Sequence, residues 1–138
     1  KISGPLLDRI DIQIEIVPVP FEKISETRKS ESSAAIRERV IAARNIQEER
    51  FADEPGIYCN AQMSAKHLDR YAEIDDKCRS LLRNAMNRFD LSARAYERII
   101  KISRTIADLE GRESITVQDI SEAVLFRNLD RSTWQKIG

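Results

Sequence analysis

Four isoleucines between Ile10 and Ile16 alternate with Asp11, Gln13 and Glu15, and this alternation places the strongest constraint on the fold. A period of two residues is typical of a β-strand that buries one face. A single strand leaves its backbone donors and acceptors unpaired, and no other segment of the sequence predicts a partner for it. We therefore expect the rest of its sheet to lie upstream, in a longer protein of which this chain is a piece.

Composition limits the class of protein. There are 23 Lys and Arg against 23 Asp and Glu, so no net field attracts the chain to nucleic acid or to an anionic membrane. Cys59 and Cys78 are too few and too widely spaced for a disulfide framework or a paired zinc site. The sequence has neither an apolar run that would span a membrane nor the features of a signal peptide at its start. We therefore expect a cytoplasmic protein without a membrane partner.

Helical periodicity dominates the sequence after a polar, proline-containing connector at residues 18–31. Apolar residues recur at helical spacing in five segments, each of which begins at a Ser, Thr or Asp that can cap a helix. The predicted helices begin at Ser32 or Ser33, Ser64, Asp75, Ser92 and Thr116, and they end near Phe51, Tyr71, Arg88, Gly111 and Phe126. The patterns predict a mainly α fold, a bundle of about five helices preceded by one β-strand.

The segment between Ser92 and Gly111 is the clearest of these helices. Its apolar residues form one face, which predicts burial. Arg94, Arg98 and Lys101 follow one another at i, i+4 and i+7 on a different stripe. This stripe is either an ordinary solvated surface or a positive ridge that another part of the protein contacts.

Three segments carry a resemblance to a known family: SGPLLDRIDI, LSARAYERIIKISRTIADLEG and ITVQDISEAVLFRN. In this order they resemble the C-terminal part of the magnesium-chelatase-like AAA+ ATPases of bacteria, in the ComM or YifB branch. The resemblance implies a P-loop ATPase core followed by a helical lid. It divides the chain into a remnant of the core at residues 1–17, with the last core strand, a linker at residues 18–31 and a C-terminal helical lid domain at residues 32–138.

The resemblance also implies roles for two arginines. Arg9, which the LLDR segment places at a tight corner, matches an arginine finger that reaches into the ATP site of the neighbouring subunit. Its planar, permanent charge suits the transferring phosphoryl group. Arg94, in the SAR segment, matches the sensor-2 arginine that faces the phosphates of ATP in its own subunit. From the residues alone, a local ion pair of Arg9 with Asp8 or Asp11 is a second interpretation.

The chain lacks the parts of an ATPase that bind the nucleotide. None of its four glycines is followed by lysine, so no GxxxxGK[ST] phosphate-binding loop is present. No apolar run ends in Asp-Glu, as the Mg²⁺-binding strand of such ATPases requires. We expect this chain alone to be inactive and to hold no cofactor. The resemblance implies that the intact protein is an ATPase that uses ATP and Mg²⁺ and joins this lid to its own upstream core in a homo-oligomeric ring, for which a hexamer is favoured.

Resemblance to ComM implies that ATP turnover is coupled to DNA remodelling, as a helicase or branch-migration motor in natural transformation. Two alternatives stay open: a subunit of a chelatase motor that inserts a metal into a porphyrin, and a free-standing helical module that binds DNA or protein. Apart from the two arginines, the sequence predicts no metal site and no nucleophile within the chain. His67 is expected at the surface, Cys59 and Cys78 show no signature of a nucleophile, and Asp75 is expected to cap a helix.

Overall fold

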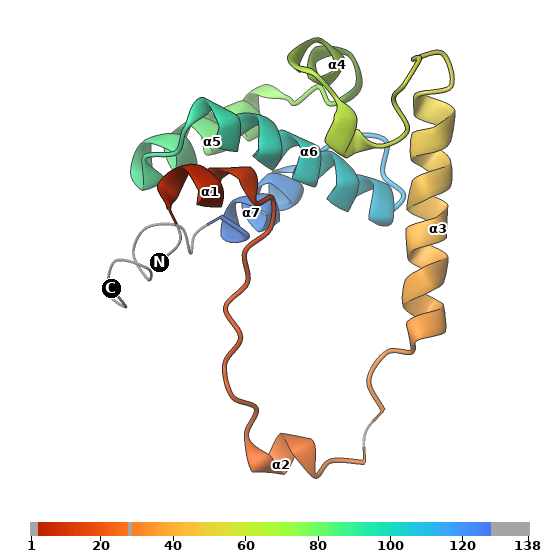
Figure 1. Cartoon of the computed structure of the whole chain (residues 1–138), viewed down its shortest axis with the longest axis vertical. Coiled ribbons are helices and arrows are strands. Elements are labelled where there is room, and N and C mark those ends of the chain that lie inside the picture. The colour runs from red at the N-terminus through yellow and green to blue at the C-terminus, as the bar shows by residue number, and fades with distance from the viewer. Residues whose placement is uncertain (1–2, 28, 128–138) are drawn as a thin grey trace.

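The structure is a computed structural model that describes residues 3–27 and 29–127 (Figure 1). Within these ranges the chain is mainly helical, as predicted, and contains no β-strand. Two short helices come first, and a 3₁₀ helix, η1, interrupts the five longer ones. The elements are α1 (Gly4–Arg9), α2 (Phe21–Ile24), α3 (Ser33–Arg50), η1 (Asn60–Gln62), α4 (Ala65–Tyr71), α5 (Asp76–Phe89), α6 (Ala93–Leu109) and α7 (Val117–Leu125).

All five predicted helices form, as α3 to α7, and their first residues lie where the capping side chains place them. The side chains of Ser32, Asp75 and Ser92 each accept a hydrogen bond from a backbone N–H three residues further on. Ser64 and Thr116 form capping boxes at the starts of α4 and α7. These contacts satisfy backbone donors that have no partner within the helix.

Two helices end in a left-handed backbone conformation. Gly111 has φ +70° just after α6, and Asp90 has φ 48° at the end of α5. Glycine adopts this conformation without steric cost, and aspartate is among the few other residues that tolerate it. The predicted ends of both helices are confirmed.

Helix α6 is the centre of the fold. It contacts α7, α3, α4, α1 and η1 (Figure 1). Its Ile99 is completely buried, and Ile120 of α7 and Leu82 of α5 meet in the same core. Further buried residues in this core are Phe51, Met63, Leu68, Ala72, Ile74, Cys78, Ala85, Ile100, Ile102, Ile115, Ala123 and Val124. The apolar face predicted for this helix therefore organises the body of the protein.

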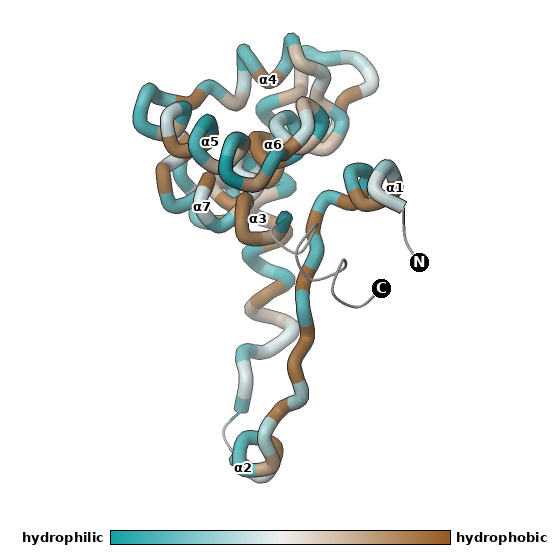
Figure 2. The backbone as a smooth tube through the Cα atoms, turned by 90° about the vertical axis from the view of Figure 1, so that its left-hand side faces the viewer, coloured by the Kyte–Doolittle hydropathy of each residue, from teal (hydrophilic) through white to brown (hydrophobic). Residues whose placement is uncertain are grey.

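Helix α3 projects beyond this body (Figures 1 and 2). Its C-terminal half packs on α6 and buries Ala43 and Gln47. Near its other end Ile36 and Val40 are 43% and 39% exposed. Only half of the predicted apolar line is therefore covered in this chain.

The first seventeen residues differ from the prediction at the tight corner, and the predicted strand is not confirmed. The tight corner is the helix α1, which Ser3 caps and of which Arg9 is the last residue. Residues 10–16 are extended but pair with no strand in the described part of the chain. Exposure along them reaches 89% at Ile16, although Figure 2 shows the alternating hydropathy plainly. An isolated extended segment has no second layer in which to bury its isoleucines.

Among the described helices, none combines the length and the apolar content of a membrane-crossing segment.

Candidate functional site

A positively lined pocket lies between α1 and the N-terminal half of α6. It has a volume of about 430 Å³ and is lined by Arg9, Arg94, Glu97, Arg98 and Lys101. Four of these five side chains are cationic and one is anionic. The arrangement is suited to binding an anion, and above all one with several oxygen atoms that accept hydrogen bonds from guanidinium groups.

The three basic residues of α6 reach the pocket because of their helical phase. Arg94, Arg98 and Lys101 lie on one stripe of the helix, and the opposite face carries the buried Ala95 and Ile99. The Ser92 cap fixes the first turn, in which Arg94 is the second residue. The predicted positive ridge therefore forms one wall of the pocket.

Arg9 joins this ridge from the end of α1, so the structure brings together the two arginines that the resemblance singled out. Both side chains are exposed to solvent. Asp11 pairs with Arg98, and the Asp8 carboxylate lies 3.9 Å from Arg127. Within residues 3–27 and 29–127 neither acidic neighbour forms an ion pair with Arg9. The local pairing considered from the sequence is therefore not the arrangement in this structure.

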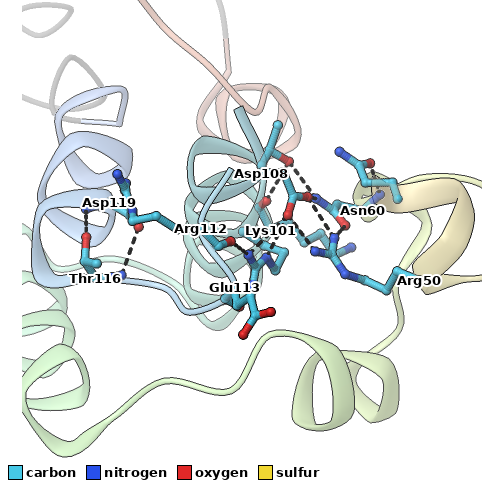
Figure 3. A network of polar contacts seen from close by, with 11 residues as sticks. Arg50, Asn60, Lys101, Asp108, Arg112, Glu113, Thr116 and Asp119 are labelled. Carbon is cyan, nitrogen blue, oxygen red and sulfur yellow. Dashed lines mark hydrogen bonds and ion pairs between the residues drawn. The ribbon is translucent and has the colours of Figure 1, made fainter. Parts of the chain in front are cut away.

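A buried polar network holds the other half of α6 in place (Figure 3). The guanidinium group of Arg50 donates two hydrogen bonds to Asp108, at 2.8 and 2.5 Å. Asn60 lies between the helices, where its amide donates to Asp108 at 2.8 Å and its carbonyl accepts from Arg50 at 2.8 Å. Gln47 accepts a hydrogen bond from the backbone of Asn60 at 2.9 Å. The network ties α3 and η1 to α6, which carries the pocket.

Arg104 extends the network toward the loop after α6. It lies 3.1 Å from Asp108 and donates to the carbonyl groups of Arg112 and Glu113 at 2.8 and 2.7 Å. Burial lowers the pKa of Arg104 from its usual value, and the nearby Asp108 opposes this shift. Arg112 in turn pairs with the buried Asp119 (Figure 3). These contacts hold the loop after α6 against the helix.

Lys101 connects the two regions. It lines the pocket, and its ammonium group donates to the carbonyl of Ala61, beside Asn60, at 3.3 Å. Movement of η1 would therefore change one wall of the pocket.

The residues discounted from the sequence take structural positions. His67 is half-buried rather than at the surface, because its Nδ1 accepts a hydrogen bond from the Ser64 backbone at 3.1 Å and its Nε2 lies 3.4 Å from Glu54. A hydrogen bond from the Tyr71 hydroxyl lowers the pKa of Glu54. Burial raises the pKa of the Cys78 thiol to about 11, which is unsuited to a nucleophile. No group of three potential metal ligands occurs within the described residues.

Sequence reasoning missed two contributors to the site. Glu97 lines the pocket as its acidic member. Arg127, just after α7, contacts the end of α1, which carries Arg9. Helical phase on α6 was enough to predict Glu97, which lies one turn from Arg94, whereas Arg127 meets residues more than a hundred positions away.

Residues 30–127 match the family described as magnesium chelatase, subunit ChlI C-terminal. This chain belongs to that family. It is 39% identical over 132 residues to the competence protein ComM of Haemophilus influenzae and 36% identical to the protein YifB of Salmonella typhimurium. It is also 32% identical over 127 residues to the protein Rv2897c of Mycobacterium tuberculosis.

The alignments with ComM and the Salmonella YifB cover 95% of this chain and 25% of each relative, and that with Rv2897c covers 92% and 25%. The chain therefore spans about a quarter of the length of the curated relatives it matches. The resemblance to the ComM and YifB branch, predicted from three segments, is confirmed.

Proposed function

We propose that this magnesium chelatase C-terminal domain is the nucleotide-responsive lid of an AAA+ ATPase, and that its pocket contacts the phosphate groups of ATP. The observation that carries the proposal is the convergence of Arg9 and Arg94, 85 positions apart in the sequence, on one cationic pocket. Membership of the chelatase family supports the proposal independently of the geometry.

The chemistry of the pocket fits phosphoryl oxygens better than it fits a metal ion. Arginine presents a planar fork of donors that matches phosphate oxygens, and its charge stabilises the charge that spreads over a transferring phosphoryl group. Among the described residues, Glu97 is the one carboxylate that lines the pocket. Mg²⁺ takes oxygen ligands from carboxylates and phosphates, so its protein ligands would come from the ATPase core. The chain supplies cations to the reaction and the core binds the nucleotide.

In the intact protein we assign Arg94 to ATP bound in its own subunit and Arg9 to ATP in the neighbouring subunit of a homo-oligomeric ring, with six subunits as the favoured number. The resemblance favours this assignment, whereas the shared pocket favours the alternative, in which both arginines of one subunit reach the same nucleotide. Mixing subunits that carry Arg9→Ala with subunits that carry Arg94→Ala separates the two. If the two arginines of one subunit act on different nucleotides, some interfaces in the mixed ring combine an intact Arg9 with an intact Arg94, and turnover is expected to recover in part. If they act on the same nucleotide, no interface has both, and no recovery is expected.

The test of the proposal is the rate of ATP hydrolysis by a longer protein that joins this chain to its ATPase core. Arg9→Ala is expected to lower kcat by about a thousandfold, in the range measured for arginine fingers. Arg94→Ala is expected to lower it in the same direction. Arg79→Ala is the matched control, because Arg79 is an exposed arginine on α5 that pairs with Asp76 away from the pocket. Wild-type turnover in both pocket variants would contradict the proposal.

We propose DNA as the substrate that the motor remodels, because the chain is similar to a protein named competence protein ComM and the resemblance to the ComM branch implies DNA remodelling in natural transformation. Stimulation of ATP turnover by DNA would support this. The family description keeps the chelatase alternative open, and it predicts stimulation by the metal-insertion partner instead. A free-standing DNA-binding module predicts that this chain alone binds DNA with an affinity that falls steeply with salt. If the chain is a lid, it is expected to bind DNA weakly by itself at every salt concentration.

A further inference from the structure

We propose that Arg127 is a positioning residue that holds Arg9 at the pocket through hydrogen bonds to the backbone at the end of α1. The inference rests on the proposed function of Arg9.

Arg127 is a charged side chain in an unusual place. It lies just after α7, and its side chain is completely buried. Burying a charge is costly unless the charge is paired and hydrogen-bonded. The buried guanidinium group of Arg127 therefore requires hydrogen-bond partners around it.

Arg127 contacts residues on both sides of Arg9 in the sequence. Its Nη1 donates to the carbonyl oxygen of Ile10 at 2.5 Å and to that of Asp11 at 3.5 Å. Its Nη2 donates to the carbonyl oxygen of Asp8 at 3.4 Å and lies 3.9 Å from the Asp8 carboxylate. The carbonyl groups of Asp8 and Ile10 immediately precede and follow Arg9, and that of Asp11 is one residue further on. The Asp8 carbonyl belongs to the last turn of α1, where carbonyls lack partners within the helix. A cation there also opposes the partial negative charge of the helix end.

Gln13 also attaches the segment after α1 to the end of α7. The backbone N–H of Gln13 donates to the carbonyl of Phe126 at 2.9 Å, and the Gln13 side chain donates to the carbonyl of Leu7 at 3.1 Å. The end of α7 thus holds the chain at positions 8, 10, 11 and 13.

α1 cannot hold this position by itself. It has six residues, and Leu7 is the one that is buried. Isolated helices of fewer than about 12 residues are marginal in water. The position of Arg9 relative to Arg94 therefore depends on contacts outside α1. The Arg127 contacts supply part of this support through α7, which packs on α6, and the direct contact of α1 with α6 and the ion pair of Asp11 with Arg98 supply the rest.

The structural half of the inference is tested by amide hydrogen exchange, followed by NMR on the 138-residue chain. Arg127→Ala is expected to speed exchange of the Gln13 amide about tenfold or more, because local opening of this segment becomes easier. Amides in the middle of α6 are the internal reference and are expected to keep their protection. Arg127→Lys keeps the charge with fewer hydrogen-bond donors, so its exchange rate at Gln13 is expected to lie between those of the wild type and Arg127→Ala. It also serves as the test variant if Arg127→Ala fails to fold.

Arg112→Ala is the matched control, because Arg112 also links the region between α6 and α7 to a buried partner, Asp119. Within residues 3–27 and 29–127 it has no hydrogen bond or ion pair with α1. It is expected to leave Gln13 exchange unchanged. Unchanged exchange at Gln13 in both Arg127 variants would overturn the inference, whatever the ATPase rates show.

The functional half is tested by a double-mutant cycle on ATP turnover in the longer protein with its ATPase core. Misplacing a catalytic group by about 1 Å can cost a hundredfold, so Arg127→Ala is expected to lower kcat by about that factor with a smaller change in KM. If Arg127 acts through Arg9, adding Arg127→Ala to Arg9→Ala is expected to cost less than about twofold more. Arg127→Lys is expected to restore part of the rate.

The outcomes separate the two proposals. Losses in kcat that multiply in the double mutant would overturn the positioning role and leave the proposed function of Arg9 intact. Wild-type turnover of Arg9→Ala would overturn the proposed role of Arg9, and the positioning role of Arg127 with it.

Discussion

The body of the chain, α3 to α7, and the N-terminal part at residues 3–27 differ in how they bury their apolar side chains. In the body, the apolar stripes pack on one another and the buried charges have partners, so Ile99 and Asp108 are completely or almost completely inaccessible to solvent. In the N-terminal part, Ile14 and Ile16 are 68% and 89% exposed, and Leu7 is the buried apolar side chain. The difference indicates that the body carries its own packing information, whereas the isoleucine alternation has no packed partner among the described residues.

The largest expected effect lies in the polar network of the body. Asp108→Ala removes the shared partner of Arg50 and of the buried Arg104. We expect a loss of about 3–5 kcal/mol in the free energy of unfolding, because a buried charge is left uncompensated. Urea denaturation measures this loss.

Asp76→Ala is the control for that experiment, because the Asp76 side chain is fully exposed in its ion pair with Arg79. Its unfolding midpoint is expected to match that of the wild type. An equally small effect of Asp108→Ala would show that the network does not hold α3 and η1 on α6.

The second prediction compares an isoleucine from each region. Ile99→Ala leaves a cavity in the core and is expected to cost about 2–5 kcal/mol. Ile16→Ala is expected to change the stability of this chain by less than about 0.5 kcal/mol, because Ile16 is exposed. Thermal unfolding of the two variants measures both values. A large loss from Ile16→Ala in this chain would remove the contrast between the two regions.

The third prediction concerns the pH dependence of the body. The Asp75 carboxylate accepts a hydrogen bond from the backbone N–H of Cys78, and this contact lowers the pKa of Asp75. A folded-state pKa below the unfolded value stabilises the protein above the unfolded pKa of about 3.9, and the stabilisation is lost as the pH falls through the folded pKa.

Melting temperatures measured between about pH 2 and pH 6, a range that spans the carboxyl titration, test this prediction. Asp75→Asn keeps a capping side chain without the titrating group, so it is expected to reduce the fall in melting temperature at low pH. An unchanged pH profile in this variant would exclude Asp75 as a source of the acid sensitivity.

The smallest expected effect is the exposed ion pair that joins the two regions. Asp11 and Arg98 form this pair with side chains that are 50% and 28% exposed. A double-mutant cycle on Asp11→Ala and Arg98→Ala is expected to give a coupling of at most about 1 kcal/mol, smaller still in high salt. A much larger coupling would mean that this pair, rather than Arg127, attaches the N-terminal segment to the body.

Much of the fold could be predicted from the sequence, because helix capping and apolar periodicity are local signals. Ser92 and Gly111 bound α6 in the pattern as they do in the structure. The helix α1 was missed although Ser3 caps it and Pro5 lies in its first turn, both of which are signals for a helix start. The isoleucine alternation carried more weight than these signals.

The candidate site could be predicted from the sequence only in part. The helical phase of Arg94 and Arg98 predicted one wall, and the resemblance singled out Arg9. The convergence of Arg9 and Arg94 depends on long-range packing that no spacing reveals. The contact of Arg127 with Ile10 joins residues 117 positions apart, and the pair of Arg50 with Asp108 joins residues 58 positions apart. Such contacts follow from how the helices pack, so they required the structure.

The most direct test of the account is a structure of the intact protein with a non-hydrolysable ATP analogue. The account predicts guanidinium nitrogens of Arg94 and Arg9 within about 3 Å of phosphate oxygens, each from the subunit that the mixing experiment assigns. It also predicts that residues 10–16 pair as a strand of the core sheet. An analogue bound away from a pocket that keeps Arg9 and Arg94 in solvent would contradict the central claim.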